Sequence, residues 1–270
     1  MHNNRSPFPT ALQAALLLLA TLVLEYLLSA AFYDARNSLG LTGEQMSVLV
    51  TVLGNGIVIS VAMHLQGCAF RDLIQPGGTP WLPTLVLVVP PVLLLTPLIL
   101  LLDTTLISAL QSLLPLSAYE VATFSAMNFQ SLPMALAVCV VAPVVEEMFF
   151  RGVLLRGFLQ LYPRARAIGY SALFFGVAHL NIYQFCLAFF LGLLLGLLYE
   201  RGRSLLPCMA LHAALNTSVY LLSSGTDTSA ADDSAGSTSL TWLVALLLAA
   251  AGAFALQKVL RLWSPPRQAA

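Results

Sequence analysis

The chain has very little charge. Of its 270 residues only 9% are Asp, Glu, Lys or Arg and 59% are hydrophobic, which gives a mean hydropathy of +0.86. A soluble domain carries about 25% charged residues, so the composition excludes one and predicts a polytopic membrane protein. Because twelve basic and twelve acidic side chains cancel, nothing favours nucleic acid as a partner.

Cysteine is also sparse, and its spacing excludes further kinds of site. The four cysteines form no Cys-x-x-Cys motif (Cys68, Cys139, Cys186 and Cys208), which argues against a disulfide framework or a cysteine metal site. We expect buried free thiols. The chain also lacks Gly-x-Ser-x-Gly, His-Glu-x-x-His and a Gly-x-Gly-Asp pair of aspartates. The serine, zincin and aspartyl routes of hydrolysis are therefore unsupported.

Long apolar runs are abundant. A membrane-spanning helix needs about 20 mainly apolar residues, and eight runs qualify as candidate spans: 12–32, 46–64, 82–102, 132–161, 165–180, 182–199, 205–223 and 240–262. Prolines at Pro90, Pro91 and Pro97 predict a kink in the third span, and we expect 103–120 to lie on the membrane surface. The sequence thus predicts an all-α membrane protein, a bundle of about eight transmembrane helices. Residues 1–270 would form one polytopic domain, with a motif-bearing core at about 132–223.

The basic residues predict how the bundle is oriented. They border alternate loops and the chain ends, and include Arg5, Arg71, Arg156, Arg164, Arg166, Arg201, Arg203, Lys258 and Arg261. The remaining loops carry acidic side chains and, of the basic residues, only Arg36. By the positive-inside rule, we expect a multi-pass protein with both termini in the cytoplasm, in the plasma membrane if the source is bacterial.

The fourth span carries the most unusual stretch, Glu146-Glu147-x-x-x-Arg151. A charge near the centre of a spanning helix costs at least about 2.5 kcal/mol. Glu147 and Arg151 are four residues apart and can pair on one helical face. Glu146 points about 100° away and is left without that partner. We therefore interpret Glu147 and Arg151 as a structural ion pair and Glu146 as the functional candidate.

Two further spans carry polar side chains at helical spacing. Phe175 and His179 share one face of the fifth, and His212 and Asn216 share one face of the seventh. Ionisable groups in spans usually face the bundle interior, whereas Phe175 is expected to pack or to line a pocket. Glu25 lies alone in the first span, and the sequence suggests no role for it.

This set of side chains suits amide hydrolysis. Glu146 could act as a general base on a water molecule that one imidazole shares. The second imidazole and the Asn216 amide could donate hydrogen bonds to the developing oxyanion.

The three ordered motifs resemble those of the CAAX protease and bacteriocin-processing family, which includes the type II CAAX prenyl endopeptidases and the bacterial Abi proteins. They are Glu-Glu-x-x-x-Arg (146–151), Phe-x-x-x-His (175–179) and His-x-x-x-Asn (212–216). The resemblance implies an eight-helix, glutamate-dependent intramembrane protease. Glu146 would be the base, His179 would share its water, and His212 with Asn216 would form the oxyanion site. Glu147, Arg151 and Phe175 would support them.

The family is often labelled metalloprotease, and Glu146, His179 and His212 could bind zinc as a His₂Glu site. Zinc ligation would leave no free base except Glu147, so we favour a water activated without metal. The substrate would be a peptide or protein, lipidated or embedded in the bilayer, with no nucleic acid partner. Two alternatives remain: a proton-coupled transporter or channel, and a non-enzymatic immunity or scaffold protein.

Overall fold

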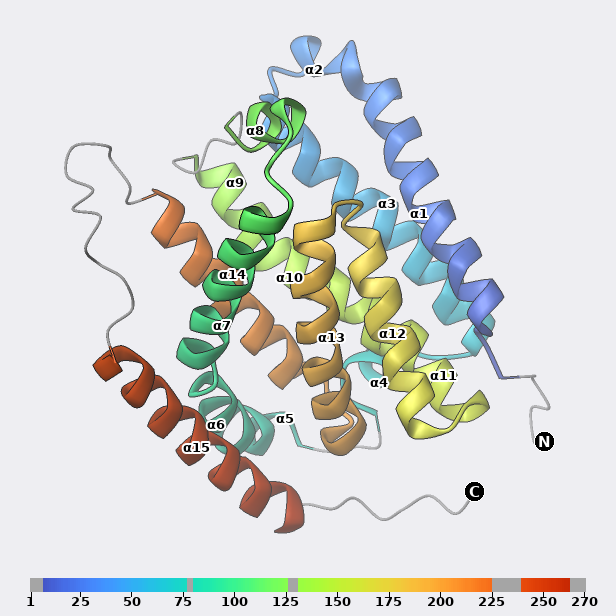
Figure 1. Ribbon diagram of the computed structural model, residues 1–270. Helices are drawn as coiled ribbons and strands as arrows, with labels where there is room; N and C mark the ends of the chain where they lie inside the picture. The colour runs from blue at the N-terminus through green and yellow to red at the C-terminus, as the bar shows by residue number, and fades with distance from the viewer. Residues whose placement is uncertain (1–6, 77–79, 126–130, 225–238, 263–270) are drawn as a thin grey trace, which may run out of the picture.

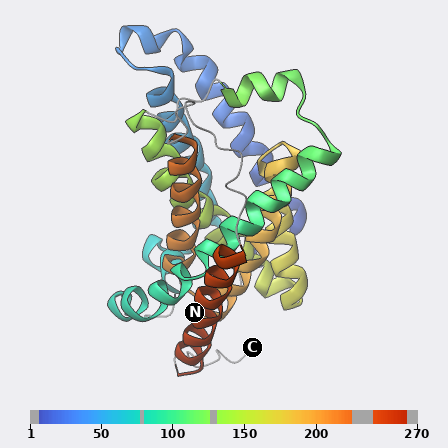
Figure 2. The same cartoon turned by 60° about the vertical axis from the view of Figure 1, so that its left-hand side comes forward.

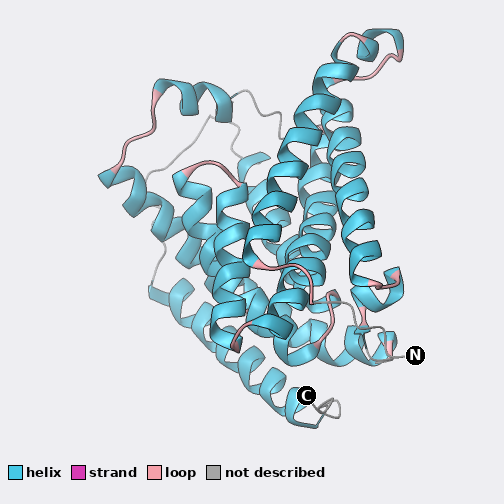
Figure 3. Cartoon of the chain, turned by 90° about the vertical axis from the view of Figure 1, so that its right-hand side faces the viewer, coloured by secondary structure: helices cyan, strands magenta, loops and turns pink. Residues whose placement is uncertain are grey.

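The computed structural model describes residues 7–76, 80–125, 131–224 and 239–262, and all regular structure within these ranges is helical (Figure 3). Three of the segments are π-helical and labelled η. The elements are α1 (Ala11–Tyr33), α2 (Ala35–Ser38), α3 (Gly43–Gln66), α4 (Phe70–Ile74), α5 (Trp81–Pro83), η2 (Thr84–Val88), α6 (Val89–Leu93), α7 (Thr96–Leu113), α8 (Ala118–Ser125), α9 (Leu132–Leu136), η3 (Ala137–Val141), α10 (Ala142–Glu147), η4 (Met148–Leu155), α11 (Arg156–Leu161), α12 (Arg164–Ala178), α13 (Ile182–Gly202), α14 (Leu206–Ser224) and α15 (Ser239–Leu262).

The protein is an all-α membrane protein, as the sequence predicts. Six helical stretches in the described residues are long and apolar enough to cross a membrane: α1, α3, α7, the composite helix Leu132–Leu161, α13 and α15. The predicted count of eight is not confirmed. α12 has 15 residues and begins with arginine, and α14 is made more polar by side chains such as His212 and Asn216.

The predicted third span is wrong in its boundaries. Helix α6 ends at Leu93 and α7 begins at Thr96, so the chain is interrupted beside the prolines, as expected. Pro97 lies in the first turn of α7, where its missing N–H removes no intrahelical hydrogen bond. Helix α7 then continues through Asp103 to Leu113. The predicted surface helix over 103–120 is therefore replaced by the second half of α7 and the start of α8.

The helices pack around the composite helix Leu132–Leu161. α1 lies along α3, α12 along α13, and α15 covers α6 and α7 (Figures 1 and 2). α14 contacts both α10 and η3. Every residue from Phe149 to Leu155 in η4 is buried, and the main apolar core surrounds this segment. The stretch that carries the motif charges is thus the centre of the bundle.

Several arginines lie at one end of the bundle. The start of α12, the end of α13 and the end of α15 lie at the lower end in Figure 1 and carry Arg164, Arg201 and Arg261. α2 and α8 lie at the upper end.

The four cysteines are free thiols, but only Cys208 is fully buried, so the expected burial holds for one of them.

Candidate active site

The glutamates lie on a helix whose winding changes along its length. Pro143 is in the first turn of α10, directly after the π-helical segment η3, and a second π-helical segment, η4, follows Glu147. A proline has no N–H to donate to the preceding turn, which fits the change in winding before Pro143. π-helical turns are rare and occur frequently at functional sites.

Glu147 and Arg151 form the predicted ion pair. Arg151 Nη1 donates to Glu147 Oε1 at 2.8 Å, and both side chains are completely buried. Arg151 Nη2 also donates to the carbonyl oxygen of Gly192 at 3.4 Å. The guanidinium carbon lies 4.4 Å from the ring centroid of Phe175, so the charge is also stabilised by a π face.

His212 connects α14 to both glutamates. Its Nδ1 lies 2.9 Å from Glu147 Oε1 and its Nε2 lies 3.8 Å from Glu146 Oε2. With a proton on Nδ1, the imidazole donates to Glu147, which fixes the ring and aims Nε2 at Glu146. Glu147 is therefore shared between a guanidinium and an imidazole.

Glu146 differs from Glu147 in its surroundings. Its side chain retains 29% of its exposure, whereas that of Glu147 retains none. No hydrogen-bond donor in the described part of the chain reaches the buried Oε2 atom of Glu146. The same is true of Glu147 Oε2 among the described residues, so the two glutamates differ in their exposure and in their contact with Arg151.

His179 is positioned by the end of α12. Ser171, Phe175 and His179 are spaced four residues apart on α12, and His179 is the C-cap residue. The Nδ1 atom of His179 lies 2.9 Å from the carbonyl oxygen of Phe175. When Nδ1 carries the proton, this contact is a hydrogen bond and Nε2 is left as an acceptor.

Phe175 is the side chain that joins these groups. Its ring packs edgewise on the rings of His179 and His212, at centroid distances of 5.2 and 5.6 Å. It is 1% exposed and also packs against Phe150. The structure therefore brings Glu146 and His212 together directly, and connects His179 to them through the Phe175 ring.

Asn216 lies one turn beyond His212 on α14. Its Nδ2 donates to the carbonyl oxygen of Val138 at 2.9 Å, which ties α14 to η3. The same NH₂ group has a second hydrogen, so one donor is still available.

The zinc site that the sequence leaves open as an alternative does not fit this arrangement. Among residues 7–76, 80–125, 131–224 and 239–262, no group of three or more His, Cys, Asp or Glu side chains is arranged to hold a metal ion. His179 is connected to Glu146 and His212 only through the Phe175 ring among the contacts of the described residues. We therefore derive no step through a metal.

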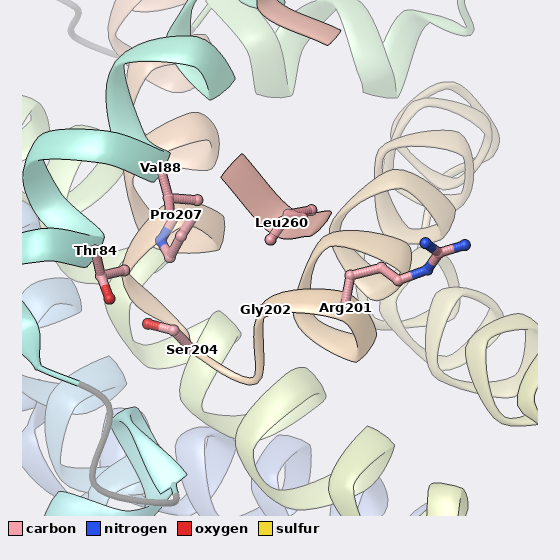
Figure 4. Close-up of a pocket in the computed structure, with 7 residues that line it drawn as sticks. All are labelled: Thr84, Val88, Arg201, Gly202, Ser204, Pro207 and Leu260. Carbon is pink, nitrogen blue, oxygen red and sulfur yellow. The ribbon is translucent and has the colours of Figure 1, made fainter. Parts of the chain in front are cut away.

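A small hollow lies elsewhere, at the basic end of the bundle (Figure 4). Its lining comes from η2, the end of α13, the start of α14 with the connection before it, and α15: Thr84, Val88, Arg201, Gly202, Ser204, Pro207 and Leu260. The Arg201 side chain points away from it. Thr84 and Ser204 are both hydrogen-bonded to Gln75. The hollow contains none of the motif residues, and its hydroxyl groups are already engaged.

Three supporting contacts were not expected from the sequence. Ser171 donates from α12 to the carbonyl oxygen of Phe150 at 2.9 Å, and Gln66 donates from α3 to the carbonyl oxygen of Val153 at 3.0 Å. Asn55 of α3 donates to Glu25 of α1 at 2.6 Å. The sequence contains an indication of two of these contacts. Ser171 precedes Phe175 by one helical turn, and Glu25 and Asn55 are polar residues near the middle of adjacent spans.

The fold and the site define a class, a multi-pass all-α membrane protein with a glutamate–histidine cluster among its spans. Residues 128–218 match the family described as Type II CAAX prenyl endopeptidase Rce1-like. This match confirms the family resemblance that the three motifs suggest, and all three lie within it. The family implies a protease that acts on peptides or proteins in a membrane environment. No match was found among the curated proteins or among the solved structures.

Proposed function

We propose that the protein is an intramembrane endopeptidase that hydrolyses a peptide bond with a water molecule activated by Glu146. One observation carries this proposal. Glu146 Oε2 has no hydrogen-bond donor among the described residues, and His212 Nε2 lies 3.8 Å from it. That separation is too long for a direct hydrogen bond. One water or substrate oxygen could contact both atoms.

In the proposed reaction the oxygen of the water molecule attacks the scissile carbonyl carbon, and Glu146 accepts a proton from this water. His179 shares this water through its Nε2 atom. When the tetrahedral intermediate collapses, the carbon–nitrogen bond breaks and Glu146 returns the proton to the leaving nitrogen. The base is therefore regenerated in each cycle.

The oxyanion would be stabilised from α14. His212 contacts Glu147 through Nδ1, so its Nε2 atom faces the site and, when it carries a proton, can donate a hydrogen bond to the oxyanion. The second hydrogen of the Asn216 amide is the other donor. One such donor typically contributes about 2.7–4 kcal/mol to stabilising the transition state.

The substrate would be a peptide that is lipidated or lies within the bilayer. This part of the proposal is supported by the match to a prenyl endopeptidase family and by the position of the glutamates within a spanning helix. We further propose that the basic end of the bundle, and with it both chain termini, faces the cytoplasm, following the positive-inside rule. In a bacterial source this membrane would be the plasma membrane.

The test compares membranes that contain the wild-type protein with membranes that contain Glu146→Gln, by mass spectrometry of peptide termini. A precursor should accumulate in the variant, and purified wild-type protein in detergent should cleave it about 10²–10⁴-fold faster than the variant. Asp34→Asn, which removes an exposed charge from the end of α1, serves as the control and should cleave normally.

Equal cleavage by wild type and Glu146→Gln would refute the proposal. Ion flux through liposomes that depends on Glu146, without cleavage, would instead identify a transporter or channel.

A further inference from the structure

Ser171 carries a completely buried hydroxyl group on α12, and the reaction proposed above does not use it. The hydroxyl donates to the carbonyl oxygen of Phe150 in η4 at 2.9 Å. Among the described residues this is the only side-chain hydrogen bond between α12 and the composite helix Leu132–Leu161. The helix that ends at His179 is therefore joined to the helix of the glutamates at this point.

Other hydroxyl groups on the helices of the bundle form a different bond. A serine or threonine within a helix can donate to the carbonyl oxygen four residues before it. Thr21, Ser60 and Ser218 do so, at 3.0, 2.6 and 2.8 Å. Because Ser171 could be satisfied in the same way, burial alone does not explain its bond to a neighbouring helix. Polar side chains that bond across helices help to fix packing in a membrane.

The acceptor of this bond lies close to the ion pair of the site. The Phe150 carbonyl belongs to the peptide bond that precedes Arg151, and Arg151 pairs with Glu147. The ring of Phe150 also packs edgewise on the ring of Phe175, with the centroids 5.0 Å apart. One residue of η4 thus contacts α12 twice, through its backbone at Ser171 and through its side chain one turn further along.

The position of α12 decides where the Phe175 ring lies. The ring contacts His179, four residues later in the chain, at a centroid distance of 5.2 Å, and His212 on α14 at 5.6 Å. It also lies 4.4 Å from the guanidinium carbon of Arg151. The first contact is local to α12 and its C-cap, whereas the other two join different helices and change if α12 shifts. His179 therefore keeps its place beside the other groups only while α12 is held against η4.

Helix α13 is packed closely on α12 (Figure 1). Methyl groups at Gly176 of α12 and Gly192 of α13 would come within 2.9 and 3.0 Å of atoms of the other helix. The carbonyl oxygen of Gly192 accepts a hydrogen bond from Arg151 of η4 at 3.4 Å. Two hydrogen bonds thus hold this helix pair against η4, and the bond from Ser171 is the shorter.

We propose that Ser171 is a positioning residue of the Glu146 site. Its hydroxyl holds α12 in register with η4, which keeps Phe175 against His212 and so places His179. This role rests on the proposed function, but the register of the helices does not. It can therefore be measured without a substrate.

The first measurement uses Ser171→Ala, with Ser60→Ala as its matched control because Ser60 is an exposed hydroxyl that bonds within its own helix. Perdeuterated full-length protein with protonated Phe and His is purified in detergent and studied by NOE spectroscopy. In the wild type the Phe175 ring should give cross-peaks to both His179 and His212. In Ser171→Ala the cross-peak to His212 should lose most of its intensity, whereas the local cross-peak to His179 should remain.

The second measurement is the cleavage assay. Because a misplaced reacting group slows the chemical step without weakening substrate binding, kcat of Ser171→Ala should fall by about 10–100-fold at unchanged KM. Ser60→Ala should cleave as the wild type does. Ser171→Cys keeps the shape of serine and a weak S–H donor, so both of its readouts should lie between those of the wild type and Ser171→Ala. It also tests the inference if Ser171→Ala does not fold.

A cross-peak between Phe175 and His212 that is unchanged in both Ser171 variants would overturn the inference, even if their melting temperatures fall. Cleavage that depends on Glu146 but has the same kcat in Ser171→Ala would also overturn it and would leave the protease standing. A lost cross-peak in a protein that cleaves nothing would uphold the register and refute only the protease.

Discussion

Nδ1 of His212 lies 2.9 Å from Oε1 of Glu147, although the two residues are 65 positions apart in the sequence. The same oxygen accepts a hydrogen bond from Arg151. Adjacent glutamates on one helix therefore have different tasks. Glu147 contacts two other side chains, and the Glu146 side chain keeps 29% of its exposure, which is why we propose Glu146 as the base.

This difference predicts opposite effects of two conservative substitutions. Glu147→Gln leaves the buried Arg151 without its anionic partner and should cost about 3–5 kcal/mol of folding free energy, the usual loss when one half of a buried pair is removed. Glu146→Gln removes no ion pair with a permanent cation and should leave the melting temperature unchanged or slightly raised. Thermal melts in detergent, beside the cleavage assay, measure both. A stable but inactive Glu147→Gln would mean that the two roles are reversed.

Arg151→Lys should be destabilising although it keeps the charge. The guanidinium contacts Glu147, the Gly192 carbonyl and the Phe175 ring at once, and a lysine ammonium is a point charge that cannot reproduce this planar fork. We expect a loss of about 1–3 kcal/mol, in the range for an unsatisfied buried group. Arg166→Lys, in an exposed arginine of α12, is the control, and equal melting temperatures for the two variants would contradict the prediction.

Gly192→Ala should separate α12 from α13. A methyl group at Gly192 would lie 3.0 Å from Ala172 Cα and 3.3 Å from Phe175 Cδ1, and backbone atoms cannot move aside as a flexible side chain can. Overpacking of this kind costs about 1–3 kcal/mol, and it should also slow cleavage because Phe175 moves. At Gly169 on α12 nothing lies within 4 Å of the added methyl group. Gly169→Ala should therefore stabilise the helix by about 0.5–1 kcal/mol.

The start of α8 offers a pH-dependent test. The hydroxyl and the backbone N–H of Ser117 donate to Glu120 Oε2 at 2.7 and 2.8 Å, and these bonds lower the pKa of Glu120 below its ordinary value of 4.5. A lowered folded pKa means that the stabilisation of α8 is fully present above pH 4.5 and is lost as the pH falls through the folded value. In Ser117→Ala the pKa should rise toward 4.5. Carboxyl ¹³C NMR titration measures it, and an unchanged midpoint would show that the hydroxyl is not responsible.

Much of the fold could be predicted because apolar runs of sufficient length have few alternatives in a bilayer. The boundaries of the composite helix Leu132–Leu161 and the Glu147–Arg151 pair follow from run length and from four-residue spacing. The third span could not be placed correctly. Hydropathy does not reveal that a proline near Leu95 starts a new helix, nor that this helix tolerates Asp103.

The candidate site could be predicted only as a set of residue types. Helical spacing assigns Phe175 and His179 to one face, but it does not reveal that the Phe175 ring touches His212 and Arg151 as well. The contact of Asn55 with Glu25 depends on how α1 and α3 are aligned, and two isolated polar residues do not determine that alignment. Pairing between helices far apart in sequence is a tertiary property.

The π-helical segment η4 has a mechanical consequence. Its carbonyl groups at Phe150 and Val153 accept hydrogen bonds from Ser171 on α12 and from Gln66 on α3. These two donors come from different helices, and both bind backbone carbonyl groups of η4. The helix cannot rotate about its own axis or slide along it without breaking both bonds. Glu146 lies in α10, which continues directly into η4, so these two bonds also help to fix the orientation of the backbone that carries Glu146.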